Sequence, residues 1–274
     1  MELKTKSRNY NLTDRTHIMG ILNVTPDSFS DGGSYNSVKK AVAQATKLEE
    51  QGADIIDIGG ESTRPDHAPV TEEEEISRVI PMIEAIKKEV SIPISIDTYK
   101  AKTAKQAIEA GAEIINDVWG AKREPEIAKV AATYNVPIIL MHNRNNMDYT
   151  DLIEDMKKDL QESIEIAIST GVPKYNIILD PGIGFAKTME HNLIAMNYLE
   201  AFQAFNLPLL LGTSRKTFIG KKLDISVPQE RDVGTGATTC LGVSKGVQIV
   251  RVHNVEMTVQ LTKMMDAMLH SERG

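Results

Sequence analysis

Polar side chains end several short apolar runs of this chain, and their types suit the recognition of a flat heterocycle. Asp97, Asn116 and Asp180 each stand at the end of such a run. A carboxylate accepts two parallel N–H bonds, and an amide both donates and accepts, so these residues match a ring with an amidine-like N–H edge. The alternative is that each of them caps the helix that follows.

Basic residues follow other apolar runs and are suited to a phosphate group. The segment GGESTRP at 59–65 combines glycines with hydroxyl groups and a guanidinium. Arg215 and Lys216 form a second cluster. Arg251 and His253 end the last run on alternate residues, so both point to the same side of an extended strand. If the runs are strands of one barrel, as argued below, the three clusters lie at the same end of it and predict an oxyanion site.

The segment NVTPDSFSDGG at 23–33 has the composition of a loop but contains the aromatic residue Phe29. One interpretation is an ordinary turn whose ring folds onto the core. The other is a lid whose ring closes over a flat substrate. The sequence leaves both open.

The elements that position these residues are eight apolar runs rich in β-branched residues. The runs cover residues 17–23, 54–58, 94–97, 114–117, 137–142, 177–180, 208–212 and 247–253. Continuous apolar runs indicate strands buried on both faces, as in a parallel sheet covered by helices. Strands that alternate with helices predict a single-domain α/β protein with a closed (β/α)8 TIM barrel. An open doubly wound sheet is the second interpretation.

Helical patterns lie between the runs. Ser37 is expected to cap a first helix, and Thr71 with Glu74 forms a capping box for a second. We interpret the acidic run 72–75 as exposed and complementary to a helix dipole. The remaining helices are expected at 100–110, 124–134, 151–170, 189–204, 230–245 and 254–270.

Composition limits the classes of function. The 274 residues fit one barrel, and a net charge of −7 disfavours nucleic acid as a partner. A single cysteine, the lack of an apolar leader after Met1 and the lack of a spanning apolar run predict a cytoplasmic protein with no membrane partner. We expect an N-terminal extension at 1–15, with no readable role, and a barrel domain at 16–274.

Five segments, in this order, resemble the dihydropteroate synthase family. They are NVTPDSFSDGG at 23–33, GADIIDIGGESTRP at 52–65, DPGIGF at 180–185, TSRK at 213–216 and RVH at 251–253. The resemblance runs from about residue 16 to residue 268 and implies a (β/α)8 barrel. It implies a transferase of folate biosynthesis that condenses 6-hydroxymethyl-7,8-dihydropterin diphosphate with 4-aminobenzoate to 7,8-dihydropteroate and pyrophosphate. It also implies Mg²⁺ as cofactor, a homodimer and a target for sulfonamides.

The resemblance assigns roles to matching positions. The pterin contacts are Asp97, Asn116, Met141, Asp180, Phe185, Lys216 and Arg251. The diphosphate contacts are Asn23, Ser62, Thr63, Arg64, Arg251 and His253, and Asn23 also meets Mg²⁺. The aminobenzoate contacts are Phe29, Pro65, Phe185, Lys216 and Thr217. The catalytic positions are Phe29, Asp31, Asp97 and Lys216.

The expected reaction is a dissociative substitution, because departure of pyrophosphate is the harder step and cationic groups assist it. Thr217 departs from many relatives, which have serine after this lysine. Two other functions remain open. One is a pterin-barrel methyltetrahydrofolate methyltransferase, which needs no diphosphate clamp. The other is a non-catalytic pterin-binding paralogue.

Overall fold

The computed structural model describes residues 1–24, 33–61 and 70–271, and only the backbone for residues 33–36. Its strands are β1 (Glu2–Lys4), β2 (Asn9–Asn11), β3 (His17–Asn23), β4 (Ile55–Gly59), β5 (Ile94–Asp97), β6 (Ile114–Asp117), β7 (Ile138–Met141), β8 (Ile177–Asp180), β9 (Leu210–Leu211) and β10 (Ile249–Val252). Its helices are α1 (Gly33–Glu50), α2 (Glu72–Ile86), α3 (Ala101–Ala110), α4 (Glu126–Tyr134), α5 (Leu152–Ser169), α6 (Met189–Asn197), α7 (Thr217–Leu223), α8 (Asp232–Ser244) and α9 (Val255–Leu269). Short 3₁₀ segments lie at Lys174–Asn176, Leu199–Phe205 and Pro228–Arg231.

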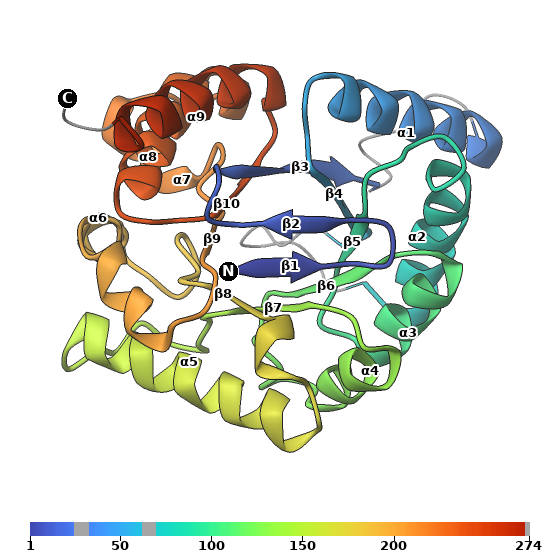
Figure 1. Cartoon of the computed structure of the whole chain (residues 1–274), viewed down its shortest axis with the longest axis horizontal. Coiled ribbons are helices and arrows are strands. Elements are labelled where there is room, and N and C mark those ends of the chain that lie inside the picture. Colours follow the sequence, from blue (N-terminus) through green and yellow to red (C-terminus); the bar gives the residue numbers. More distant parts are fainter. Residues whose placement is uncertain (25–32, 62–69, 272–274) are drawn as a thin grey trace.

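Strands β3 to β10 form one parallel sheet that closes on itself. Neighbouring strands follow the order β8-β7-β6-β5-β4-β3-β10-β9. A parallel bridge between Leu179 and Leu209 joins the two ends of this order. The helices surround the sheet as an outer ring (Figure 1). The predicted (β/α)8 barrel is therefore confirmed, and the open doubly wound sheet is excluded.

The β-branched runs form strands because both of their faces are buried. Isoleucines such as Ile56, Ile58 and Ile115 point outward against the helices and belong to one large apolar cluster. Met19, Ile114 and others point inward and belong to a second, smaller cluster. Because strand side chains alternate between the two sides, most barrel strands supply both clusters, whereas β5 supplies only the outer one because its alternate residues are Ser95 and Asp97.

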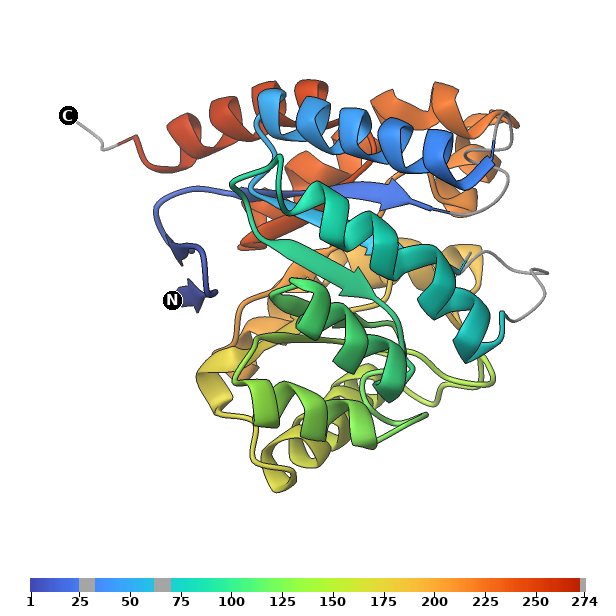
Figure 2. The same ribbon diagram turned by 90° about the vertical axis from the view of Figure 1, so that its right-hand side faces the viewer.

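Residues 1–12, for which the sequence predicts no role, close the amino end of the barrel. Strands β1 and β2 pair antiparallel. Leu3, Tyr10 and Leu12 are buried and share the inner apolar cluster with strand residues. The Tyr10 hydroxyl donates to the carbonyl of Asp54 at 2.6 Å. The hairpin lies across the end from which the barrel strands start (Figure 2), so the extension is part of the core.

The expected helices form, with shifted boundaries. Thr71 caps α2 by accepting from the amide of Glu74 at 3.2 Å. Helix α1 begins at Gly33, four residues before the expected cap at Ser37. The segment predicted as one helix over 189–204 breaks at Tyr198 and continues as a 3₁₀ turn.

The acidic run 72–75 differs from the expectation at its last residue. Glu75 is 1% exposed, and its carboxylate binds Lys100 Nζ at 2.7 Å. The same ammonium binds Glu61, just after β4, at 2.5 Å. Burial raises the pKa of Glu75, and the contact with Lys100 opposes this rise. Only the earlier residues of the run lie at the surface and complement the helix dipole.

Truncation of a buried side chain in the β1–β2 hairpin tests whether this hairpin, which plugs the amino end of the barrel, stabilises the fold without taking part in chemistry. We expect Leu3→Ala to lower the free energy of unfolding in urea by about 2–4 kcal/mol, because it removes a fully buried side chain. Lys4→Ala is the matched surface control, because Lys4 is exposed, and it should change the free energy of unfolding by less than about 0.5 kcal/mol. An unchanged urea midpoint for Leu3→Ala contradicts the role of the plug.

Candidate active site

Four strand ends lie side by side in register. Asn23 pairs with Gly59 across β3 and β4, Gly59 pairs with Asp97 across β4 and β5, and Asp97 pairs with Asn116 across β5 and β6. Further round the barrel, the last residue of β7, Met141, pairs with Asp180 of β8. The expected pterin residues therefore share the carboxyl end of one barrel. The described Asp97, Asn116 and Asp180 do not cap helices, so the capping alternative is wrong.

Arg251 is the centre of a buried ionic cluster in the barrel mouth. Its Nε donates to Asp57 Oδ2 and a terminal nitrogen donates to Asp97 Oδ2, both at 2.6 Å. Opposite charges that are close and desolvated stabilise each other strongly, so the guanidinium is held in one orientation. These carboxylates raise the pKa of Arg251 against the effect of burial, which lowers it.

Asp57 is the main site residue that the sequence interpretation missed. Its Oδ2 also accepts from Asn116 Nδ2 at 3.1 Å, so one oxygen orients both Asn116 and Arg251. Its other oxygen is buried and has no hydrogen-bond partner among the described residues. The signal was a charged residue in the middle of a strand that is otherwise buried on both faces. The apolar pattern of that run predicts only a strand.

Lys216 and Phe185 form the neighbouring part of the site. Lys216 Nζ lies 4.5 Å from the centre of the Phe185 ring and donates to the carbonyl of Ile183. A Cβ at Gly184, whose φ is +90°, would lie 2.7 Å from Lys216 Cδ. Only glycine therefore lets the lysine lie across this turn.

Burial shifts the titration of the charged groups in the barrel mouth. It lowers the pKa of Lys216 to about 8, and the nearby Asp180 carboxylate works against this. Burial also raises the pKa of Asp180, while Lys216 lowers it. The pKa of Asp97 is raised by burial, and the bound Arg251 guanidinium opposes the rise. These opposing effects are typical of charged groups gathered in a cleft.

Only one of the two neighbouring cations at 215–216 faces the site. The Arg215 guanidinium makes paired hydrogen bonds to Asp232 at 2.7 and 2.8 Å, so its expected contribution to an oxyanion site is wrong. His253 is held through Nδ1 by the hydroxyl of Ser214 at 2.8 Å. Thr217 is the exposed first residue of α7.

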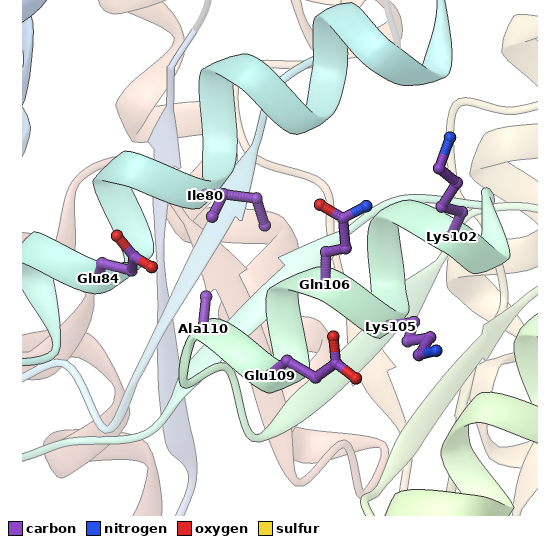
Figure 3. A pocket seen from close by; sticks show the side chains of 7 residues that line it. All are labelled: Ile80, Glu84, Lys102, Lys105, Gln106, Glu109 and Ala110. Atoms are coloured by element: carbon purple, nitrogen blue, oxygen red, sulfur yellow. The ribbon is translucent and has the colours of Figure 1, made fainter.

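Two cavities lie on different parts of the barrel. One, of about 230 Å³, opens beside Asp97 and Phe185 and is walled by Tyr99 and Trp119. The other, of about 580 Å³, is a groove on the outer wall between α2 and α3 (Figure 3). Its lining residues are Ile80, Glu84, Lys102, Lys105, Gln106, Glu109 and Ala110, none of which is an expected site residue. The cavity that belongs to the candidate site is therefore the smaller one.

Six expected site residues lie outside the described residues. They are Phe29, Asp31, Ser62, Thr63, Arg64 and Pro65. The flanking described positions, Asn23 before the first segment and Glu61 before the second, both follow strands at the carboxyl end. The choice between a turn and a lid for Phe29 therefore remains open.

The residues around Asn23 offer oxygen atoms of the kind that a magnesium ion binds. A Cβ at Gly59 would lie 3.8 Å from Asn23 Oδ1 and 3.7 Å from Asp97 Oδ2, so both oxygens lie close to the end of β4. Mg²⁺ binds through few protein oxygens and completes its shell with waters and substrate phosphates. In the part of the chain that the structure describes, no group of three or more His, Cys, Asp or Glu side chains is arranged to hold a metal.

Comparison with known proteins shows the family to which this chain belongs. The model of the family described as "Pterin binding enzyme" matches residues 19–253. Dihydropteroate synthase of Bacillus subtilis (strain 168) is 58% identical over 268 residues, which cover 98% of this chain and 94% of that protein. Dihydropteroate synthase of Xanthomonas albilineans in complex with 7,8-dihydropteroate superposes with a TM-score of 0.91 at 37% identity. The superposition covers 99% of this chain and 100% of that one.

The barrel, the polar groups at its mouth and these matches define the class of protein: a pterin-binding enzyme built on a (β/α)8 barrel. Within that class, the chain belongs to the dihydropteroate synthase family. It is a transferase of folate biosynthesis.

Substitution of Asp57 tests whether it orients the site. We expect Asp57→Asn to lower kcat/KM by about 100-fold, since it leaves Arg251 with one carboxylate partner and disturbs Asn116. The matched control is Ser95→Ala, because Ser95 pairs with Asp57 across the strands and its buried hydroxyl makes no hydrogen bond with the described residues. Equal kcat/KM values for the two variants would show that Asp57 has no role in orientation.

Proposed function

We propose that this dihydropteroate synthase works by a dissociative substitution at the carboxyl end of the barrel. Pyrophosphate leaves the pterin methylene before the amine of 4-aminobenzoate attacks. The observation that carries this proposal is the fixed cation Arg251, which lies between two carboxylates at the mouth of the barrel. Cationic charge is available there for a leaving anion, and carboxylate charge is available for a cationic pterin.

The pterin ring is expected to bind to the strand ends. Asp180 uses Oδ1 to accept from the Gly182 amide at 2.7 Å, which fixes the carboxylate and leaves Oδ2 for the N–H edge of the ring. Asn116 is oriented by Asp57, and Met141 is buried nearby at the end of β7. Rigid strand ends suit a ring that must be held in one pose.

Departure of pyrophosphate is the step that needs most assistance. Asp57 and Asp97 use two of the five N–H donors of Arg251, so others remain for the diphosphate. His253 directly follows β10, the strand that carries Arg251, and is also an expected diphosphate contact. We propose that Asn23 holds Mg²⁺ together with the diphosphate. When bound, Mg²⁺ supplies neutralisation of the negative charge on the leaving group.

Loss of pyrophosphate leaves positive charge on the pterin methylene, and electron donation from the dihydropterin ring spreads this charge. The ionised form of Asp97 would stabilise it. The attacking group is an aromatic amine, which attacks as the neutral base and loses its proton after bond formation. A strong general base is therefore not required, and none of the described residues needs that role.

The aminobenzoate is expected to bind between Phe185 and Lys216, with Thr217 near its carboxylate. The ring of Phe185 offers a flat apolar surface, and the ammonium of Lys216 attracts a carboxylate. We propose that Phe29, Asp31 and Pro65 complete this site and that Ser62, Thr63 and Arg64 complete the diphosphate site. Sulfonamides, as mimics of aminobenzoate, are expected to compete for the same surface.

We also propose that the protein is a cytoplasmic homodimer. Large apolar side chains are exposed on the last helices, and they include Val233, which is 80% exposed, and Met264, which is 60% exposed. Apolar patches of this kind are typical of surfaces that another protein covers. None of the helices in the described ranges is both long enough and apolar enough to cross a membrane.

Release of pyrophosphate is the direct test of this function. The purified protein, with dihydropterin diphosphate and Mg²⁺, should release pyrophosphate in proportion to added 4-aminobenzoate. Lys216→Ala should lower kcat/KM for aminobenzoate by about 100-fold, because it removes the ammonium next to Phe185. Pterin binding without release in the unmodified protein would point instead to a non-catalytic paralogue or a methyltransferase.

Removal of the metal tests the proposed site at Asn23. With EDTA present, we expect pyrophosphate release to fall by about 100-fold or more, because the charge of the leaving group is then neutralised only by side chains. Asn23→Ala should raise the Mg²⁺ concentration that gives half-maximal activity. The same Mg²⁺ dependence in Asn23→Ala and in the unmodified protein would exclude Asn23 as a metal ligand.

A further inference from the structure

A buried chain of polar side chains behind the candidate site has no role in the proposed reaction. It consists of Lys187 after β8, His142 after β7 and Asp159 on α5. Lys187 is 8% exposed and His142 is fully buried. Lys187 Nζ lies 2.8 Å from His142 Nδ1, and His142 Nε2 lies 3.0 Å from Asp159 Oδ2. Burying a charged lysine costs free energy, so the presence of Lys187 in the interior requires an explanation.

The partners of the chain determine where its protons lie. Asp159 accepts, so His142 Nε2 carries the proton and Nδ1 is an acceptor. Burial lowers the pKa of His142 to about 4, which is consistent with a neutral ring. Burial also lowers the pKa of Lys187 to about 7, and Asp180 and Asp159 oppose this. Lys187 therefore donates to His142.

The ammonium of Lys187 also holds the loop that carries Phe185. Nζ donates to the carbonyl of Gly182 at 3.0 Å and to the carbonyl of Phe185 at 3.1 Å. Together with His142 Nδ1, this makes three acceptors for the three N–H bonds of an ammonium group. Lys187 therefore acts as a clamp that holds together the turn between residues 182 and 185 of the loop 181–187.

The loop needs such a clamp because its backbone is strained at Ala186. Gly182, Gly184 and Ala186 all have positive φ, at 65°, 90° and 47°. For alanine this conformation is unfavourable and persists only where surrounding contacts impose it. A Cβ at Gly182 would lie 2.0 Å from the carbonyl oxygen of His142, so the loop also packs directly on the end of β7.

The clamp fixes the position of Phe185 relative to Lys216. Lys187 binds the carbonyls of residues 182 and 185, while Lys216 binds the carbonyl of Ile183 between them. We propose that Lys187, oriented by His142 and Asp159, is a positioning residue that holds Phe185 against the aminobenzoate site. This inference rests on the proposed function and extends it to residues that do not touch the substrates.

A double-mutant cycle tests whether Lys187 acts through Phe185. We expect Lys187→Met to raise the KM for 4-aminobenzoate by about 10-fold with a smaller change in kcat, because Phe185 is then misplaced. In the Phe185→Ala background, the same substitution should change this KM by less than about 2-fold, because two residues that act as a unit are not additive. Lys245→Met is the control, since Lys245 is a partly exposed lysine that follows α8, pairs with Glu200 and lies outside the candidate site.

The outcomes separate the possible roles. A general loss of stability lowers the active fraction and kcat equally in both backgrounds, and leaves KM unchanged. Equal KM effects of Lys187→Met in both backgrounds, or no effect in either, overturn the proposal. If Lys187→Met does not fold, Lys187→Gln keeps a donor for one carbonyl and is used in the same cycle. Absence of aminobenzoate-dependent release in the unmodified protein would refute the proposed function itself.

Asp159→Asn provides an independent test at the more exposed end of the Lys187–His142–Asp159 series of side chains. It weakens the orientation of His142 without removing the ammonium, so we expect a KM increase of about 3-fold in the same direction. This increase should also disappear in the Phe185→Ala background. An Asp159→Asn effect on KM that persists there would show that Asp159 acts by another route.

Discussion

The ionic cluster around Arg251 is the constraint on which the barrel mouth depends. Moving a charged group away from water costs several kcal/mol unless opposite charges and hydrogen bonds compensate for it. Asp57 and Asp97 provide that compensation from β4 and β5, while Arg251 comes from β10. The three strands must therefore be in the correct register for the charges to meet, and the chemistry of the site is coupled to closure of the sheet.

The site divides into a rigid part and a part carried by loops. Strand ends supply the groups that recognise the pterin and hold the cation, and their positions are fixed by the hydrogen bonds of the sheet. The aminobenzoate side depends on the 181–187 loop and on Lys216, which follow strands but are not paired in the sheet. Loop positions need their own support, and buried side chains behind the loop provide it.

The sequence predicted the barrel and the end of it that carries the site, because apolar runs and their polar ends are local patterns. It did not predict Asp57, since a charge within a strand has a meaning only once Arg251 is known to lie opposite. The burial of Glu75 and the turn of Arg215 toward Asp232 likewise depend on partners distant in the chain. The amino-terminal hairpin was missed because three-residue strands carry almost no periodicity.

Closure of the barrel through β3 and β10 has a consequence for biosynthesis. His17 pairs with Ile249, and Thr16 is bonded to Asp266 of α9 by both its amide and its hydroxyl, so the two ends of the chain hold the seam together. During translation, Thr16 and His17 are synthesised long before Ile249 and Asp266. Until then the nascent protein has an unpaired strand edge, which is the kind of surface that chaperones protect from aggregation. Dependence on α9 therefore leaves this edge vulnerable until the ribosome has completed that helix.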